Sequence, residues 1–487
     1  MKIGCNWGID QVLTIGAAAL LSCATALAGL PTTETLRHLP PGVNAIAVID
    51  VETLLQSEVA QREKWKSKQD VNYGSRPLMV PPEARTVVVA ARLNPAQDLQ
   101  QDWQVALIDL ATTFNLEDIA KTEGGYLDPV GDLQAVWTPS DAYVIEFEER
   151  MLAMAQPANR QAISRWIKFA QDNTENALSE YLDHAMKRLT NDSQFVLAVD
   201  LADVPQRHRV EEGLAELEMF SGRPKKQQEV ADLIVGLQGI TATVSVTDKI
   251  MGELRIDFRD DVGSLGDLAK PLTLQILDRF DAHLSDLDGF EAVLNGKSVT
   301  LSGPLSLSGL RRVGSLLQMG TTKFSDLQDV DPASEGSSDI VNASKAYFTS
   351  VTTLIDDLEK TLMDTRDNHA LWMERYGKKI DALPILNVDS ALLDWGASVG
   401  STFREMGLAK RGAGIRGGVR KSAVYGDYYY SNGGYYSYYR PSSSVHNQIK
   451  RQEDAKAKAV RYESWKEIQD TRAEIRRAMT EKYAIEF

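Results

Sequence analysis

Cysteine is almost absent from this chain of 487 residues. The two that occur, Cys5 and Cys23, lie in a leader-like segment with an apolar run from Val12 to Leu27. The run ends at Ala26-Leu27-Ala28, a small-x-small cleavage signal, which predicts a secretory signal peptide over residues 1–28. The mature chain then has no cysteine, which excludes disulfides and thiol chemistry and leaves stability to packed cores.

A long hydrophobic run is lacking too. The apolar stretch of the leader is too short and too rich in alanine for a membrane span, so we expect none in the mature form. An alternative lies in the same stretch, because Leu20-Leu21-Ser22-Cys23 resembles the bacterial lipobox, in which Cys23 is lipidated. Both interpretations predict export to the periplasm, the cell envelope or the medium, and cleavage after Ala28 is the favoured one.

Motifs for catalysis, cofactor binding or metal binding are missing as well. Neither a Walker motif nor a nucleophile elbow is present. Residues 412–417 read GAGIRG and match a dinucleotide fingerprint, but a helical segment precedes them and a tyrosine tract follows. We therefore assign no catalytic residue and no cofactor, and the balance leans against an enzyme. None of the histidines has a second ligand at zinc-site spacing: His38, His184, His208, His283, His369 and His446.

Charge is plentiful but unevenly distributed. The whole chain carries a net charge of -15. Residues 407–487 hold 16 Lys and Arg against 9 Asp and Glu, a net charge of +7, which leaves -22 for the rest. A basic tail on an acidic body predicts contact with itself or with another acidic surface. Export and the negative total argue against a nucleic-acid partner.

An ordered succession of short strands and helices fills residues 40–320. Segments 29–172 and 173–322 repeat one predicted order, β-α-β-β-α-β-β-α, and three anchors recur in sequence. The anchors are Asp50 with Asp200 at an offset of 150, Ile108-Asp109-Leu110 with Ile256-Asp257-Phe258 at 148, and Met154–Pro157 with Leu301–Pro304 at 147. We interpret the body as two tandem copies of an α+β unit with mixed or mainly antiparallel sheets.

Aspartates end several of these predicted strands, at positions 50, 109, 200 and 257. They are either a carboxylate cluster for a cation or the caps of the following loops and helices, and their recurrence in a duplicated unit favours caps. The alternation of Val105, Leu107 and Asp109 predicts a strand with one buried and one solvated face.

The remaining chain is predicted to be helical. Residues 323–340 form an acidic linker that contains Pro, Gly and Ser. Residues 341–408 carry apolar stripes at helical spacing, with Asp389 as an N-cap. Residues 445–487 form one long charged helix with a weak apolar stripe, interrupted by Arg472. This helix is either a coiled-coil arm or folds back on the helices before it.

A Gly/Arg/Tyr-rich tract, residues 409–444, separates these helices and is the predicted interaction site. Asn432-Gly433 is a strong signal for a two-residue hairpin turn, and tyrosines flank it on both sides. Such residues make stacking and cation–π contacts with glycans, polymers or proteins, although a linker without a partner is the alternative. The tract residues are Arg411, Arg416, Arg420, Tyr425, Tyr428, Tyr429, Tyr430, Tyr435, Tyr436, Tyr438 and Tyr439.

A resemblance to a known family appears over residues 340–487. The segments YFTSVTTLIDDLEKTL, WMERYGKKIDALPILNVDSALLDWG and EIRRAMTEKYAIEF resemble secreted proteins of unknown function from planctomycete-type bacteria. The resemblance implies the order of helical region, Gly/Tyr-rich tract and basic C-terminal helix, together with export from a bacterium. It implies no activity and no functional residue.

Two functions remain open from the sequence. The favoured hypothesis is an exported, non-catalytic interaction or structural protein of the envelope, with its basic Tyr-rich tail as the contact region. The alternative is an exported hydrolase with a cleft between the two repeats, which only the size and the duplicated body suggest.

Overall fold

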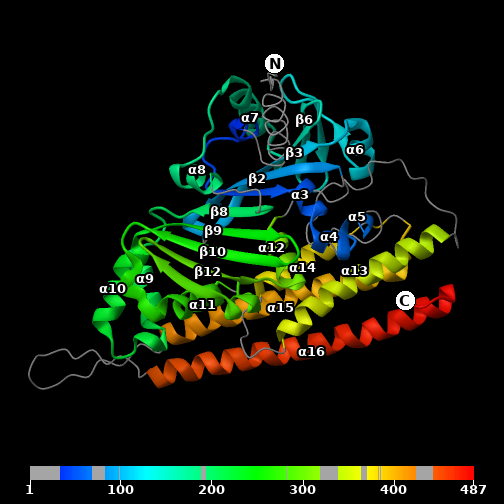
Figure 1. The fold of residues 1–487 in the computed structure, drawn as a ribbon. Coiled ribbons are helices and arrows are strands. Elements are labelled where there is room, and N and C mark those ends of the chain that lie inside the picture. Colours follow the sequence, from blue (N-terminus) through cyan, green and yellow to red (C-terminus); the bar gives the residue numbers. More distant parts are fainter. Residues whose placement is uncertain are drawn as a thin grey trace, which may run out of the picture. The chain divides into compact units, whose positions relative to one another are not determined.

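The computed structural model describes residues 33–68, 83–97, 99–187, 193–280, 282–317, 338–362, 370–381, 383, 385, 387–423 and 443–487. Its elements divide into two compact units (Figure 1). The sheet unit contains the described residues of 33–66, 83–266 and 290–305. The helical unit contains the described residues of 67–79, 267–289 and 306–487.

A twelve-stranded sheet forms the centre of the sheet unit, and its strand pairs are antiparallel. The predicted α+β class is therefore confirmed. Its spatial order is β11-β12-β10-β9-β8-β1-β2-β3-β7-β6-β5-β4. The strands are β1 (Ala45–Asp50), β2 (Ala84–Asn94), β3 (Gln100–Leu110), β4 (Tyr126–Leu127), β5 (Ala135–Thr138), β6 (Ala142–Glu148), β7 (Met151–Gln156), β8 (Phe195–Asp200), β9 (Leu237–Val246), β10 (Ile250–Phe258), β11 (Glu291–Asn295) and β12 (Ser298–Pro304).

The sheet has the same strand order on both sides of its centre. Outward from the central β1–β8 pair, one half runs β1-β2-β3-β7-β6 and the other β8-β9-β10-β12-β11. Registers correspond as well: Gln104 pairs with Gln156, and the positions 148 and 147 residues later, Gly252 and Gly303, pair with each other. The offsets found in the sequence therefore relate topologically equivalent positions of one continuous sheet.

The central strands are buried on both faces, so the predicted solvated face of β3 is wrong. Val105 and Leu107 are buried as expected, but Ala106 and Ile108 on the opposite face are buried too. A strand in the middle of a wide sheet that is covered on both faces has a continuous run of apolar residues, and Val105 to Ile108 of β3 form such a run.

Helices between the strands complete the sheet unit. The largest core cluster there combines strand residues such as Val48, Val88 and Leu107 with Ile163 and Trp166 of α7. The helices are α2 (Thr33–Arg37), α3 (Val51–Gln56), α4 (Glu58–Arg62), α5 (Trp65–Lys68), η2 (Pro95–Gln97), α6 (Leu116–Glu123), α7 (Arg160–Asp172), α8 (Glu180–Met186), α9 (Arg207–Ala215), η3 (Glu218–Phe220), α10 (Pro224–Val235) and η4 (Val262–Leu268), of which α5 and η4 extend across the unit boundary.

The helical unit contains the predicted helical region and the long C-terminal helix, and both are confirmed. Its core joins Val351, Leu354 and Leu358 to Trp372, Tyr376 and residues of the last two helices. The elements are α11 (Ala269–Arg279), η5 (Ser285–Gly289), α12 (Leu307–Ser315), α13 (Ser338–Leu362), α14 (Ala370–Asp381), α15 (Ser390–Ala423) and α16 (Ser443–Tyr483).

The last helix, α16, folds back on the helices before it. It lies beside α15 (Figure 1), and Trp465 stacks on Phe403 of α15 with ring centroids 6.1 Å apart. Ile468 and Met479 are buried in the core of the helical unit. Arg472, which breaks the apolar stripe in the sequence, donates to the Asp356 carboxylate of α13 at 2.7 Å. Charge pairing therefore replaces apolar packing at that turn.

The predicted end of the helical region at residue 408 needs correction. Helix α15 continues to Ala423, so the first part of the predicted tract, including the GAGIRG segment, is helical. The glycines lower helix propensity by about 1 kcal/mol each relative to alanine, which is why composition alone did not predict a helix here. The segment lies inside α15 and so follows directly on helix rather than on a strand, which is not the context of a dinucleotide site.

Asp389 fixes the start of α15, as the sequence predicts. Its Oδ1 accepts from the Ala391 amide at 2.9 Å, and its Oδ2 accepts from Lys482 Nζ at 2.6 Å and from the Tyr483 hydroxyl at 2.7 Å. Burial acts to raise the pKa of Asp389, but these hydrogen bonds outweigh burial and hold the pKa below the ordinary aspartate value. The charged form therefore ties the first turn of α15 to the last turn of α16.

Replacing Asp389 with asparagine, which keeps an N-capping side chain, is expected to lower the free energy of unfolding by about 1–2 kcal/mol at pH 7. A carboxylate whose pKa is lower in the folded than in the unfolded protein stabilises the fold at pH values above the unfolded-state pKa of about 4. This stabilisation is lost as the pH falls through the folded-state pKa. Urea unfolding of both proteins at pH 7 and pH 3 tests this. An equal difference at both pH values would contradict the assignment.

Candidate interaction surface on the last helix

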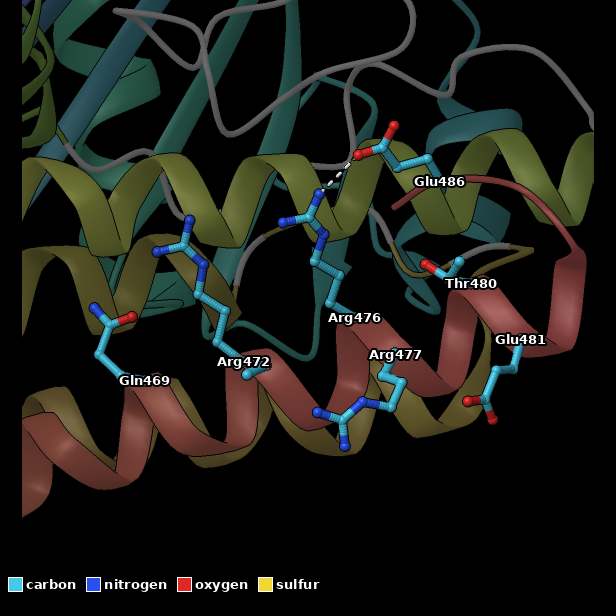
Figure 2. Close-up of a pocket in the computed structure, with 8 residues that line it drawn as sticks. Gln469, Arg472, Arg476, Arg477, Thr480, Glu481 and Glu486 are labelled. Carbon is cyan, nitrogen blue, oxygen red and sulfur yellow. Dashed lines mark hydrogen bonds and ion pairs between the residues drawn. The ribbon is translucent and has the colours of Figure 1, made fainter.

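An open groove of about 580 Å³ runs along the last four turns of α16. Ile468 and Met479 of the same helix are buried in the core of the helical unit, so the groove side chains project from a fixed backbone. Figure 2 shows Arg472 and Arg476 on one side of α16, and Arg477 and Glu481 on the other. The lining residues are Gln469, Arg472, Ala473, Arg476, Arg477, Thr480, Glu481 and Glu486.

Two of the three groove arginines are engaged within the protein. Arg472 pairs with Asp356, as noted above. Arg476 bonds Glu486 at 3.0 Å and donates from Nε to the carbonyl oxygen of Phe487 at 2.5 Å, which holds the segment after α16 against the helix (Figure 2). Arg477 is exposed and has no ion-pair partner within the described part of the chain.

The groove carries charged side chains that can take part in binding. A guanidinium offers a planar fork of donors that matches a carboxylate or phosphate, and Arg477 is available for such a contact. Glu481 lines the same groove and provides a carboxylate of opposite sign. An exposed ion pair contributes only about 0–1 kcal/mol and is screened by salt, so this surface alone supports weak binding.

The residues predicted for the interaction tract are only partly visible. Arg411, Arg416 and Arg420 lie on α15, and nothing further is defined for their side chains. All the tyrosines from Tyr425 to Tyr439, and with them the Asn432-Gly433 hairpin, lie outside the described residues, as does Cys23. The structure adds their framework, because residues 424–442 connect Ala423 of α15 to Ser443 of α16.

The strand-end aspartates do not form one cluster. Strands β1 and β8 are antiparallel, with Ile49 opposite Phe195, so Asp50 and Asp200 lie at opposite ends of the pair. Asp50 accepts from the Thr53 amide at 2.9 Å and caps α3. Asp200 accepts from the Ala202 amide at 3.0 Å. The capping interpretation is confirmed for both.

The other two aspartates form ion pairs rather than caps. Asp109 lies 2.8 Å from Arg85 on the neighbouring strand β2. Asp257 accepts from Arg255 Nε at 2.9 Å and from the Ser298 hydroxyl at 2.6 Å. Equivalent positions of the two halves therefore carry a carboxylate with an arginine partner. The arginine comes from the neighbouring strand for Asp109 and from the same strand for Asp257.

Metal ligands do not converge in the part of the chain that the structure covers. No group of three His, Cys, Asp or Glu side chains suited to an ion is found among the described residues. The fully buried His283 has Asp278 at 3.2 Å and Asp288 at 3.5 Å, and His38 has Glu148 at 3.6 Å. Of the helices described, none is both long and apolar enough to cross a membrane.

A buried charge network in the helical unit has no counterpart in the sequence-based predictions. Asp357 of α13 is 2% exposed and accepts two hydrogen bonds of 2.6 Å from Arg311 of α12. It also contacts Arg312, which donates to its carbonyl oxygen at 2.7 Å, and the Tyr376 hydroxyl at 3.2 Å. Only the acidic pair Asp356-Asp357 within an apolar stripe hints at this arrangement in the sequence.

Comparison with known proteins provides no identity. No family model matches the chain, and no curated protein matches it. Solved structures that share some similarity include crystal forms I, III and IV of TP0453, each 8% identical in sequence. Their TM-scores are 0.34, 0.34 and 0.31, and they cover 58% of this chain and 97%, 98% and 95% of their own. Similarity at this level carries no argument about fold or function.

Proposed function

We propose that the protein is an exported, non-catalytic interaction or structural protein of the bacterial envelope. In this account residues 1–28 are a cleaved signal peptide, with lipidation at Cys23 as the less favoured route, and the protein resides in the periplasm, the envelope or the medium. The proposed partner is an acidic polymer, glycan or protein that contacts the basic, tyrosine-rich tail. The resemblance to planctomycete-type secreted proteins is part of the same proposal.

One observation carries the proposal: both ends of the tyrosine-rich segment are attached to long helices of one packed unit. Helix α15 leads into the segment and α16 leads out of it. The Phe403–Trp465 stack and the buried Ile468 fix these two helices to each other and to the core. Eight tyrosines placed between such helices are presented to a partner at lower entropic expense than on a free tail.

The strand order supports a tandem duplication as the origin of the sheet unit. Equivalent strands occur in mirrored order about β1 and β8, and equivalent residues keep the offsets of 147 and 148. The two halves join through direct pairing of β1 with β8 in one sheet. A continuous sheet at that junction does not favour the alternative of a hydrolase with a cleft between the repeats.

Substitution of the eight tyrosines between Tyr425 and Tyr439 by serine tests the proposed contact. The length of the connection and both helices stay unchanged, which a deletion from residue 410 would not achieve because it would remove the end of α15. We expect the variant to leave the envelope fraction of the host and to appear in the soluble exported fraction. Retention equal to that of the wild type would show that the tyrosines make no contact that matters.

A further inference from the structure

A hollow of about 540 Å³ lies in the sheet unit, where α7 crosses the ends of β3 and β7. Its apolar walls come from Trp103 and Val105 of β3, Ala155 of β7, and Ile163, Trp166 and Phe169 of α7. The size and the mostly apolar lining are those of a small-molecule site, which typically has about 300–1,000 Å³. The proposed function of the tail does not involve this hollow.

Small residues and one anchored tryptophan create the space. Val105 pairs directly with Ala155, and the short side chain of Ala155 leaves room between the strands and the helix. The Trp166 indole donates to the carbonyl oxygen of His38 at 2.7 Å, so the ring is held in the wall and does not turn into the hollow. Trp103 and Phe169 remain half-buried and present apolar surface to solvent.

The second half of the sheet shows that these walls are not a general requirement of the fold. The positions equivalent to Val105 and Ala155 are Glu253 and Ser302, which pair with each other in the same register. Glu253 is exposed and Ser302 is half-buried. The same strand pair is therefore polar in one half and apolar in the other, so the shared strand order does not by itself require the apolar walls of the hollow.

Charge at the rim selects the sign of the ligand. Arg165 of α7 lines the hollow, is exposed, and has no ion-pair partner among the described residues. Asp102 lies on the rim too, but its Oδ1 already accepts from the Asn94 amide nitrogen at 3.2 Å. The Asn94 amide is neutral, so Asp102 keeps its negative charge and the rim carries one charge of each sign. Arg165 is the rim group suited to an acid, because a guanidinium binds a carboxylate or sulfonate through two parallel donors.

We propose that this hollow binds a small amphipathic organic anion, whose apolar body fills the space between β3, β7 and α7 while its acidic group contacts Arg165. The apolar walls supply the affinity, because they are exposed to water when the hollow is empty. Arg165 supplies orientation and discrimination between acids and amines.

Titration of the full chain with two probes of equal apolar length tests the sign of the charge. Dodecanoate, below its micelle concentration, is expected to bind at one site by calorimetry and to displace anilinonaphthalene sulfonate, whereas dodecylamine is expected not to. If dodecanoate binds but does not displace the aromatic sulfonate, the site takes aliphatic acids. If the aromatic sulfonate binds in the hollow and dodecanoate does not, the site takes aromatic acids. Equal binding of dodecylamine, or no binding of either acid, would overturn the proposal.

Three variants locate the site. Arg165→Glu is expected to weaken dodecanoate binding about tenfold, since a charge-assisted contact is lost. Lys168→Glu, one turn further on the same helix face and outside the lining, controls for charge and should leave binding unchanged. Ala162→Trp fills the hollow from an exposed position and should abolish binding. Unchanged binding in both Arg165→Glu and Ala162→Trp, with wild-type circular dichroism, would place the ligand elsewhere.

Discussion

Replacing Asp357 with alanine is expected to lower the free energy of unfolding of the helical unit by about 3–5 kcal/mol, the range for breaking a buried ion pair from one side. The carboxylate is 2% exposed and receives two short hydrogen bonds from Arg311 and a third from Tyr376. Its removal leaves the side chains of α12 and α14 without the acceptor that holds them against α13. Burial, and then the Asp357 charge, raises the pKa of Tyr376 far above the ordinary tyrosine value, so this phenol stays neutral as a donor.

The adjacent residue provides a matched control. Asp356 lies on the same helix with its side chain 44% exposed, and it pairs with Arg472 at 2.7 Å. Alanine at position 356 removes the same chemical group and is expected to change the stability by less than about 1 kcal/mol.

Native-state hydrogen exchange of α13 amides measures both variants within the intact chain. Exchange of the most protected amides should accelerate by about 100-fold or more for Asp357→Ala. It should change by less than about fivefold for Asp356→Ala. Similar acceleration in the two variants would show that the buried pair of Asp357 with Arg311 contributes no more to stability than the exposed pair of Asp356 with Arg472.

Alanine at Gly396 is expected to destabilise the helical unit by about 1–3 kcal/mol, the usual range for overpacking. Helix propensity alone predicts a change of opposite sign, a gain of about 1 kcal/mol in the interior of α15. An ideal Cβ at position 396 would overlap the Tyr347 hydroxyl of α13 and lie 2.8 Å from its ring carbon Cζ. Tyr347 is 6% exposed, so the ring has little room to move. Burial also raises the pKa of this phenol to about 12, so the hydroxyl stays neutral.

Three further variants isolate this contact. Ser398→Ala, two residues along at an exposed position of the same helix, should stay within about 0.5 kcal/mol of the wild type. Tyr347→Phe removes the hydroxyl that the new methyl group would overlap, so the Gly396→Ala/Tyr347→Phe double variant should recover part of the loss. Urea unfolding of the wild type, Gly396→Ala, Tyr347→Phe and the double variant measures the double-mutant cycle. A gain in stability for Gly396→Ala alone would refute the packing argument.

The sequence predicted the elements of the sheet unit because its strands are short apolar runs that end at aspartates. NAIAVID, WQVALIDL and QFVLAVD correspond to β1, β3 and β8, and the repeated offsets relate equivalent positions in the sheet. It did not predict that β1 and β8 pair centrally, since strand pairing between two segments 150 residues apart leaves no local signal. It also missed the burial of both faces of β3, which depends on what covers a strand rather than on the strand.

The candidate sites were harder to predict from the sequence than the fold. Arg472 showed as an interruption in an apolar stripe, and the structure explains it by Asp356, a partner 116 residues away. The hollow beside α7 depends on the pairing of Val105 with Ala155 and on the position of Trp166 in its wall. The spacing of apolar residues in the sequence shows neither. The tyrosine cluster was conspicuous by composition alone, and the helices that flank it define where a partner would meet it.

Fractionation of the native host, followed by crosslinking and pull-down of the protein, tests the proposed function most directly. We expect an exported protein whose first residue follows Ala28 and whose crosslinks to an acidic envelope component map to the tyrosine-rich segment and α16. Recovery from the cytoplasm with residues 1–28 still attached, or crosslinks that avoid this region altogether, would contradict it.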